Sequence, residues 1–353
     1  MQDRRRQLSL AALTCVGLTL SVLSVTPVSA WDRGNVETFA VLPAGTATIE
    51  GLTVGPNGNV HVTTFDPRPT ATPPAQLFVF NDNGKLLRQV SIQGSTAATL
   101  GLAFHPTTHA LLVIDFGAAK VLNVDPNTGT SSVFMTVPPP PPGAAAGLNA
   151  LTFDAAGNVY VSDSFQGIIW KTGPGGGVAT AWVGPHPLLQ PGTGIPPFGA
   201  NGLQFNKNET ALFVANTAND LLVKIPVTGG TPGTPEAFTY SINGADGIVL
   251  DRDDNIWVAA NQADEIVVVD PTGKAIAKLG DFDGVKNGVT RGLLFPASPD
   301  FSKDGKWLFV TNLEMDLGSI GGPQTVDSQW AAQVKRHSIA KLRARIPPIH
   351  DQD

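Results

Sequence analysis

The chain repeats one pattern of apolar and polar positions six times. Each copy starts with a polar or special residue, continues through a short apolar strand and a turn, and ends in a second strand rich in β-branched residues. The copy that starts at residue 149, for example, reads NALTFDAAGNVYVSDSF. Short apolar stretches separated by Gly, Asn or Asp turns predict paired β-strands.

The spacing of the copies predicts the architecture. They start at residues 50, 100, 149, 201, 246 and 291, so the period is 45 to 52 residues, which is typical of a four-stranded propeller blade. Further β-rich stretches, such as 120–125 and 265–270, supply additional strands, and only 327–335 favours a short helix. We therefore predict an all-β fold, a six-bladed β-propeller; seven blades is the alternative. The spare strand at 36–42 is expected to complete the last blade and remove free sheet edges.

The first 30 residues differ in character from the rest. A basic cluster at Arg4–Arg6 precedes a mostly apolar run and the small residues that end at Ala30, which is the order of a secretory signal. The alternative, an uncleaved membrane anchor, suits a run of this marginal length less well. We predict a signal peptide at 1–30, a single propeller domain at 31–353, and export to the periplasm or the extracellular space. No later stretch predicts stable membrane insertion.

Cysteine usage and charge narrow the function classes. Cys15 is the only cysteine and lies in the predicted signal, so the exported chain would rely on core burial rather than disulfides. The net charge is −6 for the whole chain, and about −8 once three Arg and one Asp of the signal are removed. An acidic chain disfavours nucleic-acid binding. We expect a monomer that acts on a small molecule.

The first position of each copy carries the candidate chemistry. In a propeller the first strand of each blade lines the central channel, so equivalent positions form a ring around the axis. The ring predicted here consists of Glu50, Leu100, Asn149, Asn201, Asp246 and Arg291.

Four of these side chains are oxygen donors. Buried carboxylates need a partner, and Ca²⁺ binds six to eight oxygens from carboxylates, amides and water. We predict that Glu50 and Asp246 neutralise such an ion while Asn149 and Asn201 add neutral ligands. The lack of Cys and His in the ring disfavours zinc. The alternative is a polar plug without metal, in which the four side chains bond to each other, to water and to Arg291.

The blade pattern over 31–353 resembles the SMP-30/gluconolactonase/LRE-like family and its relatives, the squid-type diisopropylfluorophosphatase and the paraoxonases. That family binds a catalytic Ca²⁺ with a Glu from the first blade, Asn residues from middle blades and an Asp from a later one, which Glu50, Asn149, Asn201 and Asp246 match in order. The resemblance implies a Ca²⁺-dependent hydrolase of lactones or organophosphate-like esters. Asp246 would be the general base or nucleophile, the two Asn would also orient the substrate oxygen, and Glu50 would be a ligand only.

Two departures from the family weaken a sugar-lactone assignment. Sugar lactonases of the family carry an Arg two residues before the first channel Asn, whereas this chain has Gly147. A paraoxonase-like His–His pair has no match. Arg291 either stabilises an anionic intermediate or pairs with Asp246.

Long proline-rich segments precede two of the candidate ligands, at 137–148 and 184–200, and a third spans 64–76. Their apolar residues, such as Leu188, Leu189 and Phe198, predict a hydrophobic entrance and a partly hydrophobic substrate; the alternative is ordinary exposed loops. His186 is either a proton shuttle or a bystander.

Acidic and amide residues also recur where the second strand of a copy ends, and we interpret them as structural turn partners. Two of them, Asp163 and Asn216, are additional candidates for supporting the metal ligands through hydrogen bonds. The set consists of Asp115, Asp163, Asn216, Asn261 and Asn312.

Two functions are consistent with these sequence features. One is the metal-dependent hydrolase, and the other is a non-catalytic exported propeller that binds a ligand or protein partner and keeps its metal for structure. Fold alone does not decide between them, and the complete Glu/Asn/Asn/Asp set favours the hydrolase.

Overall fold

The computed structural model describes residues 33–346 except 195 and 321. The predicted signal at 1–30, with Cys15, lies outside the described residues. The remaining chain belongs to one compact unit. It is built almost entirely of strands, which confirms the all-β prediction. No helix among the described residues is both long and apolar enough to cross a membrane.

The first half of the chain forms three antiparallel runs of four strands. The first run is a separate sheet, and parallel pairing between Gly177 and Met135 joins the second and third runs into one eight-stranded sheet. The runs are β2 (Ile49–Val54), β3 (Val60–Thr64), β4 (Gln76–Phe80) and β5 (Leu86–Ser91); β6 (Thr99–Phe104), β7 (Leu111–Asp115), β8 (Lys120–Val124) and β9 (Ser131–Thr136); and β10 (Leu148–Phe153), β11 (Val159–Asp163), β12 (Ile168–Gly173) and β13 (Gly176–Val183).

The second half repeats the arrangement three more times, with one inserted hairpin. Its sheets are β14 (Ala200–Phe205), β15 (Ala211–Asn216), β16 (Leu221–Thr228), β17 (Thr231–Pro232) and β18 (Glu236–Tyr240); β19 (Ala245–Leu250), β20 (Ile256–Ala260), β21 (Glu265–Val269) and β22 (Ala275–Leu279); and β25 (Pro296–Phe301), β26 (Trp307–Asn312), β27 (Ser338–Arg343) and β1 (Val36–Val41). The hairpin consists of β23 (Phe282–Lys286) and β24 (Val289–Gly292).

The short helices lie in connections. The predicted helix at 327–335 is present as α1 (Val326–Ala331), which Thr325 caps by accepting a hydrogen bond from the Ser328 amide. Three single turns of 3₁₀ helix complete the set within the described ranges: η1 (Phe116–Ala118), η2 (Asn261–Ala263) and η3 (Leu317–Ile320).

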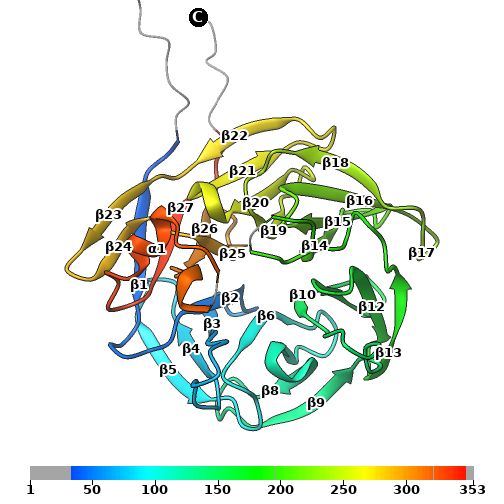
Figure 1. Cartoon of the computed structure of the whole chain (residues 1–353), viewed down its shortest axis with the longest axis horizontal. Coiled ribbons are helices and arrows are strands. Elements are labelled where there is room, and N and C mark those ends of the chain that lie inside the picture. The colour runs from blue at the N-terminus through cyan, green and yellow to red at the C-terminus, as the bar shows by residue number, and fades with distance from the viewer. Residues whose placement is uncertain (1–32, 195, 321, 347–353) are drawn as a thin grey trace, which may run out of the picture. The chain divides into compact units, whose positions relative to one another are not determined.

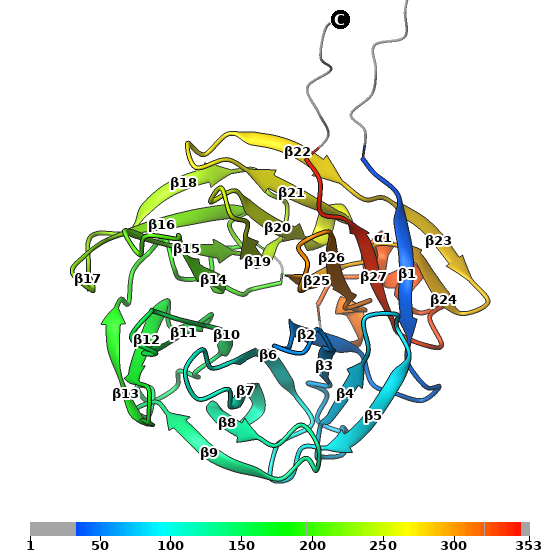
Figure 2. The same cartoon turned by 180° about the vertical axis from the view of Figure 1, so that it is seen from behind.

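The sheets follow one another around a common centre, with the first strand of each innermost (Figure 1). Each first strand contacts the next in the order β2, β6, β10, β14, β19 and β25, and β25 contacts β2 again. The N-terminal strand β1 pairs antiparallel with β27, as predicted for residues 36–42, and Figure 2 shows the two strands side by side. The ends of the described chain therefore close the circle within one sheet.

Glycine allows the innermost strands to approach one another closely. A Cβ on Gly51 would lie 2.1 Å from the backbone oxygen of Leu100 in the next first strand. The same holds for Gly202, whose Cβ would lie 2.5 Å from the oxygen of Asp246. A side chain at these positions would push neighbouring strands apart, so Gly51 and Gly202 are packing requirements.

Candidate functional site

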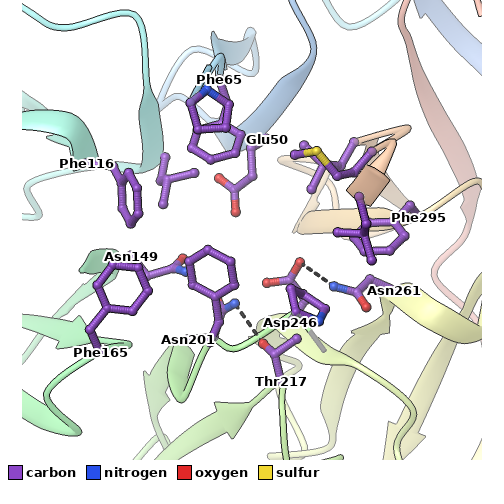
Figure 3. Close-up of a pocket in the computed structure, with 17 residues that line it drawn as sticks. Glu50, Phe65, Phe116, Asn149, Phe165, Asn201, Thr217, Asp246, Asn261 and Phe295 are labelled. Carbon is purple, nitrogen blue, oxygen red and sulfur yellow. Dashed lines mark hydrogen bonds between the residues drawn. The ribbon is translucent and has the colours of Figure 1, made fainter. Parts of the chain in front are cut away.

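The four predicted oxygen donors lie in one pocket at the centre of the molecule. Glu50, Asn149, Asn201 and Asp246 all line a cavity of about 240 Å³ (Figure 3). Each is the second residue of its innermost strand, so the repeat places them at equivalent points around the centre.

A β-bulge orients every one of these side chains. The strand pairing shifts register between Ile49 and Leu52, and the same shift recurs in the other innermost strands. The residue inside the bulge leaves the regular ladder, which changes the direction of its side chain. The repeated bulge therefore allows several strands to present side chains to one pocket.

The sixth ring position is Ala297, and the prediction of Arg291 on the axis is wrong. Arg291 lies on β24 of the inserted hairpin, is exposed, and lines a different cavity with Asp281 and Lys286. Ala297 is the second residue of β25, and its backbone oxygen faces Gly247 of the preceding innermost strand as the Leu100 oxygen faces Gly51. Arg291 is thus available neither as a counter-cation for a polar plug nor as a substrate contact in this pocket.

Burial makes the two carboxylates of the pocket depend on a partner. Glu50 and Asp246 are 5% and 3% exposed. Glu50 Oε2 and Asp246 Oδ1 are fully buried and have no hydrogen-bond partner within the described chain. Burial, with the nearby charge of Asp246, raises the pKa of Glu50 well above its usual range. Burial likewise raises the pKa of Asp246 to about 7.

These observations fit a hard cation held by oxygen ligands. A divalent ion between the two carboxylates would compensate the buried charge that otherwise has no partner. Among the described residues, no three His, Cys, Asp or Glu side chains gather at one point. The candidate set is instead two carboxylates and two amides, which suits Ca²⁺ better than zinc.

Neighbouring hydroxyl groups fix the orientation of the two amides. Asn201 Nδ2 donates to Thr217 Oγ1 at 2.9 Å, and that hydroxyl donates to the Ala245 backbone oxygen at 2.8 Å. Asn149 Nδ2 donates to Ser164 Oγ at 3.2 Å. Because each amide nitrogen is engaged, the amide oxygen is the end available to a cation or substrate.

Asn261 belongs to the pocket, although the sequence pattern placed it among the structural turn residues. Asp163 and Asn216 pair across the strands with the residues that begin β10 and β14, whereas the equivalent position in β20 is Ala260. Asn261 is one residue further along, lines the pocket, and donates from Nδ2 to Asp246 Oδ2 at 3.2 Å. Asn261 follows Asp246 by 15 residues, the separation of Asn149 from its hydroxyl partner, and this spacing was the available signal.

The remaining candidate residues stabilise loops through hydrogen bonds. Asp163 Oδ1 accepts from the Gly147 amide at 3.0 Å, and Asn216 Nδ2 donates to the Leu188 backbone oxygen at 2.9 Å. His186 Nδ1 accepts from the Leu188 amide at 3.3 Å. None of these three side chains lines the pocket or bonds to the candidate ligands within the described chain, so they act as structural partners.

Apolar side chains form the rest of the wall. Four residues of the long proline-rich segments reach the pocket, namely Phe65, Pro67, Pro196 and Phe198, whereas Leu189 packs in the core between sheets. The apolar lining consists of Phe65, Pro67, Leu100, Phe116, Phe165, Pro196, Phe198, Phe295, Leu313, Met315 and Leu317.

Comparison with known proteins places this geometry among related folds. The profile of the SMP-30/gluconolactonase/LRE-like region matches residues 103–280, which is half of the chain. A search by sequence against curated proteins gives no match.

Solved structures with a similar fold cover nearly the whole chain. A gluconolactonase from Xanthomonas campestris superposes with a TM-score of 0.58 at 15% identity, over 88% of this chain and 91% of that one. Regucalcin from Agrobacterium tumefaciens, a calcium-binding protein, gives 0.58 at 16% identity, over 86% and 94%. Streptogramin B lyase gives 0.56 at 15% identity, over 89% and 98%. At these identities the similarity establishes the fold.

Proposed function

Since the chain belongs to the SMP-30/gluconolactonase/LRE-like family, we propose that it is a Ca²⁺-dependent hydrolase of lactones, esters or organophosphate-like esters. The observation that carries the proposal is the pair of buried, unpartnered carboxylate oxygens of Glu50 and Asp246 beside two oriented amides. The similarity to a gluconolactonase and to calcium-binding regucalcin supports it. We further propose a six-bladed propeller, exported as a monomer, that acts on a partly hydrophobic small molecule.

The residues of the pocket would have different roles in the proposed reaction. Glu50, Asn149, Asn201 and Asp246 would hold the ion, which when bound supplies a Lewis acid for a carbonyl or phosphoryl oxygen. Asp246 Oδ2 is held by Asn261, while Oδ1 is buried without a partner. Asn261 thus orients Asp246, whose carboxylate would take a proton from water or attack the substrate directly.

A panel of lactones and aryl esters, assayed with Ca²⁺ and with a chelator, tests the proposal. We expect hydrolysis that chelation abolishes and that Asp246→Asn, which preserves size, reduces by at least a hundredfold. Asp300→Asn is the matched control, because Asp300 is a carboxylate that bonds to the Val54 amide away from the pocket, and this variant should retain activity. If chelation lowers only the melting temperature and no member of the panel is hydrolysed, the protein is a binding propeller and the hydrolase proposal is wrong.

A further inference from the structure

Three phenylalanines form a continuous aromatic wall on one side of the pocket. The Phe116 and Phe165 ring centroids are 5.8 Å apart, those of Phe165 and Phe198 are 5.5 Å apart, and those of Phe116 and Phe198 are 6.1 Å apart. The rings touch one another, so a ligand cannot enter between them. All three are only half-buried, and all three line the pocket, so their remaining apolar surface is open to a ligand.

This wall lies across the pocket from the reacting carboxylate. Figure 3 shows Phe116 and Phe165 on the side of Asn149, whereas Asp246 and Asn261 lie on the opposite side. A substrate whose reacting oxygen lies between the candidate ligands would thus direct one substituent toward the aromatic wall and its reacting carbon toward Asp246.

The aromatic wall of the pocket offers no hydrogen-bonding or cationic group to a hydroxyl-rich or anionic substituent. Among the described residues that line the pocket, Glu50 and Asp246 are the only charged side chains, and none is Lys or Arg. The Thr217 hydroxyl is already engaged as both donor and acceptor. The buried acceptor oxygens without a partner within the described chain belong to Glu50, Asp246 and Asn261, so substrate hydroxyls directed at the aromatic wall instead would lose water without gaining a partner, which is unfavourable for each group.

The packing around Gly147 also disfavours a polyhydroxylated substrate. A Cβ on Gly147 would lie 2.7 Å from the Phe165 ring, so the aromatic ring occupies the space that a side chain at this position would need. A polar side chain at residue 147 could hydrogen-bond to a sugar hydroxyl only if Phe165 moved away.

From these observations we propose that Phe116, Phe165 and Phe198 form a subsite for an aryl or bulky alkyl substituent of a neutral lactone or ester, and that the pocket rejects polyhydroxylated lactones. This inference rests on the proposed function for its reaction, and on the aromatic wall alone for its binding preference.

Matched lactones test the preference in the Ca²⁺-loaded protein. We expect kcat/KM for γ-phenyl-γ-butyrolactone to exceed that for γ-butyrolactone at least tenfold, and glucono-δ-lactone to be the poorest substrate. Phe165→Ala and Phe198→Ala should each lower the value for the phenyl lactone by about threefold to tenfold and that for γ-butyrolactone by a smaller factor. The control is Phe134→Ala, since Phe134 lies on the outer strand β9 and does not line the pocket. Equal hydrolysis of the three lactones, or an equal loss for all three in Phe165→Ala, would overturn the subsite.

A probe without a hydrolysable bond separates this inference from the hydrolase proposal. Saturation-transfer NMR should detect 2-phenyltetrahydrofuran on the protein but not tetrahydrofuran, and Phe165→Ala should weaken the signal. If the phenyl ether binds in this way and no lactone is hydrolysed, the subsite stands and the hydrolase proposal fails. If lactones are hydrolysed while the two ethers give the same signal, the hydrolase stands and the subsite fails.

Discussion

Thr217 joins two neighbouring innermost strands through one hydroxyl. The side chain is 1% exposed, accepts from Asn201 Nδ2, and donates to the Ala245 backbone oxygen. Thr217→Val keeps the shape of the side chain and removes only these two hydrogen bonds. The substitution therefore isolates the orientation of Asn201 from the packing around it.

Two magnitudes follow from that geometry. The variant leaves a buried amide and a buried carbonyl without their partner, and each such loss costs about 1–3 kcal/mol. The free energy of unfolding should therefore fall by about 2–6 kcal/mol. A ligand whose supporting hydrogen bond is removed typically loses about 10–100-fold in metal affinity, and we expect Ca²⁺ binding to weaken by that factor.

Denaturant unfolding in the presence of chelator and calorimetric Ca²⁺ titration measure the two effects separately. Thr217→Ser is the matched control, because it restores the hydroxyl without the methyl group and should recover most of the affinity. A Thr217→Val protein that is destabilised as expected but binds Ca²⁺ like the parent would refute the orienting role of Thr217.

Two further predictions concern stability. Burial lowers the pKa of His61 to about 4 while the unfolded value is about 6.5, so the unfolded chain takes up a proton first on acidification. His61 should therefore contribute a loss of about 3 kcal/mol in the free energy of unfolding between pH 6.5 and 4; His61→Gln should lack this component, and parallel acid dependences of the two proteins would contradict it. Gly51→Ala, whose Cβ would meet the Leu100 oxygen at 2.1 Å, should lower the free energy of unfolding by about 3 kcal/mol. Gly175→Ala, with nothing within 4 Å, should not; equal stability of the two alanine variants would exclude close strand approach as the cause.

The sequence predicted the all-β fold and five of the six ring positions because one local pattern recurs wherever an innermost strand forms. The Gly or Ala that follows each of these five ring residues allows neighbouring innermost strands to approach closely, and the apolar residues after it are buried between sheets. The sixth position failed because the hairpin β23–β24 precedes the last innermost strand and ends in Arg291-GLLF, which imitates the pattern. Only the pairing of Pro296 with Asn312 distinguishes the true strand, and pairing is not visible in one sequence.

The residues that line the pocket were harder to predict, because several of them lie in the turns and loops that follow the strands. Position 261 was misassigned by one residue, because its Asn resembles the acidic and amide residues that end other second strands, although its separation of 15 residues from Asp246 equals that of Ser164 from Asn149. The aromatic wall combines Phe116 and Phe165, which follow second strands, with Phe198 from a long loop. Their contact results from tertiary packing, so no local periodicity reports it.

The residue that follows each second strand explains why the pocket has a polar half and an apolar half. Next to Asn149, Asn201 and Asp246 it provides a hydrogen-bonding anchor. Next to Glu50 it is apolar, and the Glu50 carboxylate has no hydrogen bond from the described residues. Glu50 thus has the weakest protein support of the four candidate ligands and the greatest need of a cation, while the apolar residues in its half of the ring leave surface for a hydrophobic substrate. Around the ring these residues are Phe65, Phe116, Ser164, Thr217, Asn261 and Leu313.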